Sequence, residues 1–182
     1  MKIPTYYVIP QSEYRVIELL KLNDVKMSTI KKDSVINVES YRILDFQTVK
    51  NPYEGHYLHY KTVVGRAQEQ HLFCAGDILV HLNQDAMKFL LETLEPEAVD
   101  SYFNWNFFDA ILGQKEYYSA YVFEDTAADL LKNDKALKTA FELEKAKDPI
   151  FAEDGSAQLD WIYKNSPYYE KSHRLYPIFR IN

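Results

Sequence analysis

The chain lacks the His-x-x-Glu motif, in which a three-residue gap lets an imidazole and a carboxylate converge on one tetrahedral zinc ion. Its five histidines are followed three positions later by His, Thr, Cys, Gln or Tyr, and they are His56, His59, His71, His81 and His173. Zinc chemistry of this type is therefore not expected in this chain.

Cysteines and long apolar runs are also scarce. The single cysteine, Cys74, excludes an internal disulfide, and its apolar neighbours Leu72 and Phe73 predict a buried thiol. No stretch reaches the roughly 18 uninterrupted apolar residues of a membrane-spanning helix. Pro4 and the charged residues beyond Pro10 leave no space for the apolar core of a signal peptide. We expect neither a membrane span nor a signal peptide in this sequence.

Positive charge is in the minority. The net charge is −6 and the pI is near 5.4, whereas a nucleic-acid footprint needs Lys and Arg clustered on one face. The nearest basic run, Lys31-Lys32, is followed directly by Asp33. A nucleic-acid partner is not expected.

What the chain does contain is ordinary globular composition, with 47% hydrophobic and 26% charged residues over 182 positions. This length predicts a single domain, 1–182, of the α+β class, because strands dominate its first half and helices its second. Its expected parts are a β-α-β unit over 1–30, a strand-rich part over 38–82, a helical part over 84–165 and a terminal edge strand over 173–182.

Period-two patterns predict the strands of the first half. They are Thr5–Ile9, Val25–Ile30, Val38–Val49, His56–Val64 and His71–Leu82, the last broken near Gly76-Asp77. Between the first two lies a helix that Ser12 is expected to cap and Asn23 to end. In the strand from His56, the alternation predicts that Leu58 and Tyr60 face the core and His59 a wetter side, with Gly65 closing the strand.

A period near 3.6 predicts helices beyond Asn83. The first is capped by Asn83 or Asp85 and stopped by Pro96, and others are expected over 96–112, 120–132, 134–146 and 156–164. The helix over 96–112 would bury Phe103 and Phe107 and turn Trp105 to the opposite side. The final strand contains Pro177, which predicts an edge position.

The spacing His56-x-x-His59, with Glu54 just before it, is the only pattern that resembles a metal site. Residues three apart on a strand point to opposite faces, so both imidazoles reach one ion only if His56 belongs to the loop. We favour a structural turn in which Glu54 and His56 hydrogen-bond their neighbours.

Aromatic residues are dense between Tyr102 and Phe123. They form either a core and docking face or a platform for sugars, and the four-residue spacing of Phe103 and Phe107 favours the core. The platform would use four rings: Tyr102, Trp105, Tyr117 and Tyr118.

Three further groups of polar residues have ordinary explanations. Asn83, Gln84 and Asp85 would bind an anion at a helix start or simply cap the helix, and capping is favoured. Asp100-Ser101 has no partner histidine in sequence. The acidic pairs Glu124-Asp125 and Glu153-Asp154 are typical of solvated helix starts.

Several segments resemble the C-terminal region that follows the catalytic domain in a group of bacterial zinc carboxypeptidase-like (metallocarboxypeptidase family) proteins. The most specific are NPYEGHYLH at 51–59, LEPEAVDS at 94–101 and SPYYEKS at 166–172. Longer matches cover 6–25, 75–112, 114–131, 157–163 and 165–181. The zinc-ligand motif of the family has no counterpart here, so none of its catalytic residues can be assigned.

The resemblance implies a non-catalytic accessory domain that packs on, or shapes the substrate cleft of, an upstream zinc peptidase domain. Its implied partners are that domain and, through it, a peptide substrate, with zinc held by the parent and no cofactor in this chain. The implied parent is exported to the periplasm or cell envelope. We expect the docking surface among Tyr53, Glu54, His56, His59, Asn83, Gln84 and Trp105.

Two alternatives remain open. An independent carbohydrate or cell-wall binding module would need exposed, coplanar aromatic rings. An enzyme built on Glu54, His56 and His59 would need those side chains to converge in a pocket.

Overall fold

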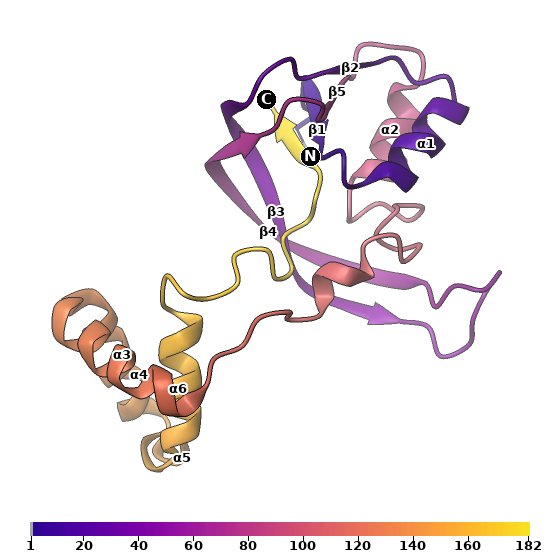
Figure 1. Ribbon diagram of the computed structural model, residues 1–182. Coiled ribbons are helices and arrows are strands. Elements are labelled where there is room, and N and C mark those ends of the chain that lie inside the picture. The colour runs from indigo at the N-terminus through magenta and orange to yellow at the C-terminus, as the bar shows by residue number, and fades with distance from the viewer. Residues whose placement is uncertain (1) are drawn as a thin grey trace. The chain divides into compact units, whose positions relative to one another are not determined.

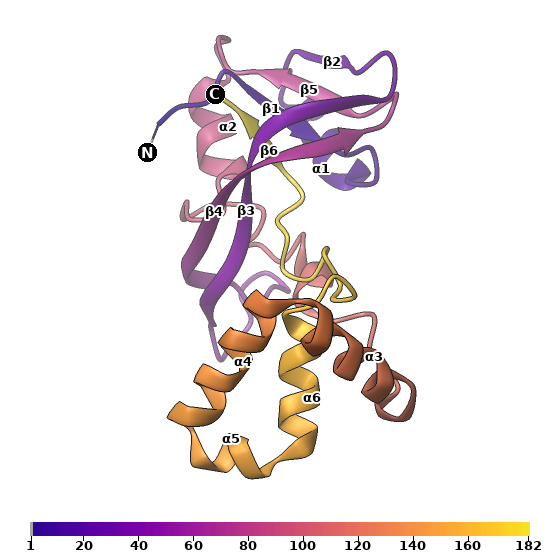
Figure 2. The same ribbon diagram turned by 90° about the vertical axis from the view of Figure 1, so that its left-hand side faces the viewer.

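The computed structural model describes residues 2–182 and divides the chain into two compact units. One, the sheet unit, contains the residues up to Gly113 together with Arg174–Asn182, and the other, the helical unit, is Gln114–His173. Figure 1 shows the elements of both units, and Figure 2 shows them from the side. The α+β class is confirmed. The length alone predicted a single domain, whereas the structure divides the chain into two compact units.

A six-stranded antiparallel sheet organises the sheet unit, in the order β2-β5-β1-β6-β3-β4. The strands are β1 (Tyr6–Ile9), β2 (Met27–Thr29), β3 (Ser34–Thr48), β4 (His59–Phe73), β5 (Ile78–His81) and β6 (Phe179–Ile181). The expected N-terminal β-α-β unit is present in split form, because β5 lies between β1 and β2 and pairs antiparallel with both.

Alternating side chains give the sheet two apolar faces. Tyr7 and Ile9 of β1 point to the face covered by α1 (Tyr14–Leu22) and α2 (Met87–Leu94), while Val8 between them packs with Phe73 and Phe179 on the other face. Helix α1 presents Val16, Ile17 and Leu20 to the first face. Period two in the strands and 3.6 in the helices thus produce a main core on the helix-covered face and a smaller cluster on the other face.

The two longest strands, β3 and β4, pair from Ser34↔Phe73 to Thr48↔His59 and form a hairpin that runs past the shorter strands (Figure 2). Gly65 does not close a strand, as expected from sequence, but pairs with Arg42 inside the ladder. An extra residue in β4 between Tyr60 and Val63, where Lys61 has a φ of 53°, shifts the alternation. For this reason the expected faces are wrong at the start of β4.

Residues 96–112 do not form the expected helix. They form successive turns followed by one 3-10 helix, η1 (Asp109–Leu112). The Asn104 side chain donates to the carbonyls of Ala98 and Val99, and its backbone N–H donates to the Ser101 hydroxyl. Such local side-chain bonds compete with the helical hydrogen-bond ladder.

Expected caps of the sheet-unit helices are also wrong. Helix α1 starts after Glu13 and α2 after Ala86, and neither has a side-chain cap from Ser12, Asn83 or Asp85. The terminal strand is not at an edge: β6 lies between β1 and β3. Pro177 precedes β6, so its missing N–H removes no bond from the ladder.

A buried polar network lies where β1, β3, β6 and the end of α2 meet. The Glu95 carboxylate accepts from the hydroxyls of Tyr7 (2.5 Å) and Tyr41 (2.9 Å), and its Oε1 lies 3.2 Å from Arg180 Nε. Arg180 also contacts Glu39. Burial, reinforced by the Glu95 charge, raises the pKa of both tyrosines, which therefore remain hydrogen-bond donors.

The helical unit contains α3 (Ala120–Asn133), α4 (Lys135–Lys147), α5 (Pro149–Glu153) and α6 (Gly155–Lys164). Three of these helices match the predicted ones, and α5 was not predicted. The carboxylates of Asp134, Asp148 and Asp154 cap α4, α5 and α6, each accepting from two backbone N–H groups. Phe123, Phe141 and Tyr163 centre the core of this unit.

Cys74 is exposed rather than buried, because it lies in the turn after β4 and not in the sheet. Among residues 2–182, no helix has the length and apolarity to cross a membrane.

Candidate functional site

His59, the first residue of β4, lies at the centre of a polar cluster in the sheet unit. Its side chain is buried, with Nδ1 2.9 Å from Thr48 Oγ1 and Nε2 3.0 Å from Asp109 Oδ1. An ionised carboxylate only accepts hydrogen bonds, so the Nε2–H of His59 donates to Asp109, and in the neutral imidazole Nδ1 then accepts from the Thr48 hydroxyl. The sequence had placed His59 on the wetter face of this strand.

The imidazole of His59 is also held by packing. Its ring centroid lies 4.5 Å from that of Phe46 and 5.1 Å from that of Phe103. The backbone N–H of His59 donates to the Asn104 carbonyl, and the Asn106 side chain donates to the Tyr57 carbonyl. The cluster therefore fastens the 96–112 segment to the far end of the hairpin.

A hydroxyl, an imidazole and a carboxylate in this order also occur where enzymes activate a nucleophile. Here Asp109 is 49% exposed, so solvent screens its charge, whereas the aspartate of a catalytic triad is buried. Glu54 lies at the exposed tip of the turn. We interpret the cluster as a rigid support and not as a reaction centre.

Beside His59 is a hollow of about 260 Å³ that Tyr60, Val99, Asn104 and Trp105 help to line. Trp105 is half-buried, with its ring 6.2 Å from Tyr53 and 5.5 Å from His56. The structure thus gathers Tyr53, His56, His59 and Trp105 of the expected surface. We call this region, with Tyr60 and Val99, the His59 surface.

The turn that carries Tyr53 and His56 is a two-residue hairpin. Tyr53 and His56 exchange backbone hydrogen bonds of 2.8 and 2.9 Å, and Glu54 and Gly55 between them have φ of 48° and 81°. Two positive φ values are typical of the tight turn whose twist matches that of paired strands. Glycine at position 55 adopts this conformation without steric cost.

Asn83 and Gln84 lie in the loop between β5 and α2, and the Gln84 side chain has a structural role. Gln84 Oε1 accepts from Lys26 N (2.8 Å), while its Nε2 donates to the carbonyls of Lys26 and His81. This side chain fastens the start of β2 to the end of β5. Since α2 starts after Ala86, these residues form neither the favoured cap nor the alternative anion site at the helix start.

The helical unit contains a hollow of about 390 Å³, which we call the aromatic hollow. The sequence did not predict a concave site there. The hollow is lined mainly by rings, those of Tyr117, Tyr118, Phe123, Tyr163 and Tyr168, with Glu116, Ser119, Val122 and Thr126. Tyr117 and Tyr118 stack with centroids 4.8 Å apart and planes 19° apart. Burial, with smaller effects of Tyr117 and Asp160, raises the pKa of Tyr118 to about 12, so this phenol is neutral at physiological pH.

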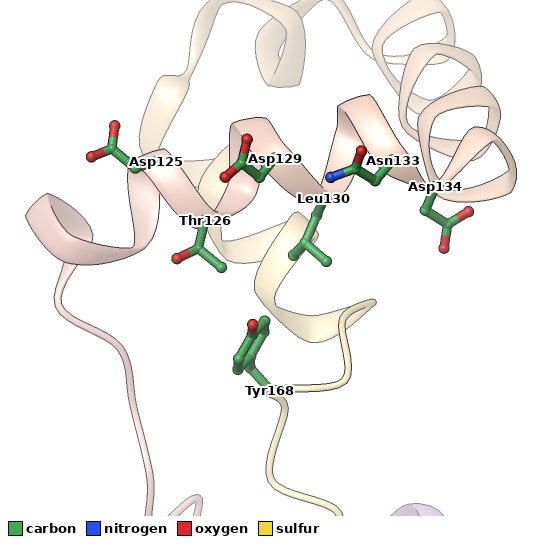
Figure 3. A pocket seen from close by; sticks show the side chains of 7 residues that line it. All are labelled: Asp125, Thr126, Asp129, Leu130, Asn133, Asp134 and Tyr168. Carbon is green, nitrogen blue, oxygen red and sulfur yellow. The ribbon is translucent and has the colours of Figure 1, made fainter.

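A second hollow of the helical unit, the acidic hollow of about 450 Å³, is lined by Asp125, Thr126, Asp129, Leu130, Asn133, Asp134 and Tyr168 (Figure 3). In Figure 3, Thr126 and Leu130 point toward Tyr168, and the Asp125 and Asp129 carboxylates stand along the same helix. The sequence signal that could have indicated this hollow is the four-residue spacing of Asp125 and Asp129, because residues four apart share a helix face.

The four-ring platform considered from sequence is not assembled as one surface. Tyr102 is buried in the core of the sheet unit, and Tyr117 and Tyr118 belong to the helical unit. A saccharide stacks on exposed flat rings. Of the four rings, Tyr117 and Tyr118 stack on each other, and only Tyr117 is exposed.

Over residues 2–182, no group of three or more His, Cys, Asp or Glu side chains is arranged to hold a metal ion. Comparison with known proteins identifies no relative, since no family model, no curated protein and no solved structure matches the chain.

Proposed function

We propose that this chain is a non-catalytic accessory domain of a zinc carboxypeptidase-like protein, which docks on the upstream catalytic domain and shapes its substrate cleft. In this proposal the zinc ion and the hydrolytic water belong to the upstream domain. The proposal is supported by the resemblance of the segments quoted above and by the geometry of the sheet unit.

The observation that carries it is the His59 surface. Tyr53 and Tyr60 are 57% and 40% exposed, and Val99 is 82% exposed. Apolar side chains gathered beside a hollow are typical of protein docking sites. Trp105 at the centre is the type of residue that contributes most to such interfaces.

The polar cluster beneath this surface supports a docking role. Three hydrogen-bonding groups, Thr48, Asp109 and the Asn104 carbonyl, and two aromatic rings fix His59, so the hollow keeps its shape before a partner arrives. A preformed surface lowers the entropic cost of association.

Binding of this chain to the catalytic domain of the proposed parent tests the docking role by calorimetry. We expect Trp105→Ala to weaken binding by roughly 30-fold or more, as for a central interface residue. Tyr14→Ala removes an aromatic ring of the same unit that is 62% exposed and does not line the hollow, and it should leave the affinity unchanged. Equal effects of the two substitutions would contradict the proposed docking surface.

The non-catalytic part of the proposal is tested on the chain alone. We expect no zinc to remain after a chelator wash and no cleavage of peptides with a free C-terminus. One retained zinc per chain would contradict the accessory role. Cleavage lost on Glu54→Ala would instead support an enzyme built on Glu54, His56 and His59.

A further inference from the structure

The aromatic hollow of the helical unit is open and apolar. Tyr117 is 69% and Tyr168 58% exposed, although both rings line the hollow. Beneath them Tyr118 packs on Tyr163 at 4.7 Å and on Phe123 at 5.0 Å, which fixes the floor. An open hollow with a rigid floor is suited to receive an apolar side chain of a partner.

Charge identifies the kind of partner. The acidic hollow shares Thr126 and Tyr168 with the aromatic hollow, so the two adjoin along α3. Together they are lined by four acidic residues, Glu116, Asp125, Asp129 and Asp134, and by no Lys or Arg. The amino group of Lys164, on α6, lies 2.6 Å from Asp160 and is thus already paired.

We propose that this pair of hollows binds a basic peptide segment. An aromatic or aliphatic side chain of the segment enters the aromatic hollow, and a neighbouring Lys or Arg side chain reaches the Asp125 and Asp129 carboxylates. The shared residue Tyr168 contacts both parts, because the face of its ring attracts a cation and its edge packs against an apolar group.

Other ligand classes fit less well. The acidic lining repels nucleic acid and anionic lipid. A neutral sugar would leave the carboxylates of the acidic hollow without a counter-charge, whereas a basic side chain supplies one. The site lies in a different unit from the His59 surface and does not depend on the docking proposal.

The direct test uses the full chain and fluorescein-labelled hexapeptides measured by fluorescence anisotropy. The probe is Lys-Phe-Lys-Lys-Phe-Lys, and its controls replace every Lys by Glu or every Phe by Ser. We expect binding of the probe alone, weakened severalfold between 50 and about 300 mM salt as the charges are screened. Equal binding of the Glu peptide, or binding of a cell-wall oligosaccharide in place of the probe, would overturn the proposal.

Matched variants locate the binding. Asp125→Asn combined with Asp129→Asn should lower the affinity roughly two- to five-fold per carboxylate at low salt, while Glu142→Gln, an exposed acid on α4 outside both hollows, should not change it. Asp134 is left intact because it caps α4.

Tyr168→Ala should weaken binding roughly three- to thirty-fold, and Tyr168→Phe should restore most of it because the ring remains. Tyr121→Ala removes a ring that is 88% exposed on α3 but lines neither hollow. Circular dichroism of each variant verifies folding. If Tyr121→Ala weakens binding as much as Tyr168→Ala does, the peptide binds elsewhere and the proposal is wrong.

Discussion

The sheet unit and the helical unit are stabilised in different ways. In the sheet unit, residues far apart in sequence meet in one buried network, such as Tyr7, Glu95 and Arg180. In the helical unit, polar contacts are mostly local, and Asp134, Asp148 and Asp154 each bond the N–H groups two and three positions ahead. Long-range polar contacts are thus more prominent in the sheet unit than in the helical unit.

This difference affects both stability and function. A helical unit as short as Gln114–His173 buries little apolar surface, and a core of this size supplies roughly 3–5 kcal/mol. We therefore expect it to unfold at lower denaturant than the sheet unit. Each unit contains one tryptophan, Trp105 or Trp161, so fluorescence of single-tryptophan variants reports on each unit separately.

The largest effect is expected in the network of the sheet unit. Glu95→Ala should lower its free energy of unfolding by about 3–5 kcal/mol, because the buried Tyr7 and Tyr41 hydroxyls lose their acceptor and the buried Arg180 loses one of its two carboxylate partners. Glu97→Ala breaks an exposed ion pair with Arg66 and should cost less than about 1 kcal/mol. Urea unfolding of both variants measures the difference, and similar losses would show that the Glu95 network is not a main source of stability.

The second prediction concerns the aromatic segment. Phe103→Ala removes a fully buried ring and should cost about 3–5 kcal/mol. Phe107→Ala should cost less than the sequence suggested, since Phe107 is only half-buried, and Trp105→Ala least of the three. Denaturant melts followed by circular dichroism rank them, and a largest loss for Trp105→Ala would contradict the burial pattern described here.

A smaller effect is expected from the caps of the helical unit. Asp148→Ala or Asp154→Ala should each cost about 1 kcal/mol, because two N–H groups lose their acceptor. Glu153→Ala, an exposed neighbour, should stay within about 0.5 kcal/mol of the parent. Trp161 fluorescence in a Trp105→Phe background measures all three, and no difference between Asp154 and Glu153 would refute the assigned cap.

The smallest effect concerns pH. Backbone N–H groups of Lys115 and Glu116 donate to Glu170 and hold the pKa of its carboxyl below the usual range. A lowered folded-state pKa stabilises the helical unit above the unfolded pKa of about 4.3, and this stabilisation is lost as pH falls through the lower, folded value. Thermal melts between pH 6 and about 3 should therefore depend less on pH in Glu170→Gln, and an unchanged pH profile would exclude this contribution.

Elements with strong local signals were predictable. The β1 strand between two prolines, the period-3.6 stripe of α2, and helices α3, α4 and α6 all follow from the order of residues. Helix α5 was missed because its five residues are too few for a periodic signal, although Asp148-Pro149 is a typical helix start. The four-residue spacing of Phe103 and Phe107 predicted a helix that Asn104 and Ser101 prevent.

The candidate sites were less predictable than the helices. The sequence singled out His56, His59 and Trp105, which the structure gathers, but it gave His59 the wrong face because nothing in the alternation marks the extra residue near Lys61. It also considered Gln84 for binding, whereas that side chain bonds Lys26 across 58 positions of chain. Long-range partners of this kind leave no local pattern.

The sequence by itself determined the α+β class, most helices and the acidic composition, since propensity, period and charge act over a few residues. Only the tertiary structure decided that β6 lies inside the sheet, that Glu95 meets Arg180, and that Tyr168 joins two hollows. These features depend on strand pairing and packing between segments distant in the chain, whose free energy is fixed by burial and complementarity rather than by neighbouring residues.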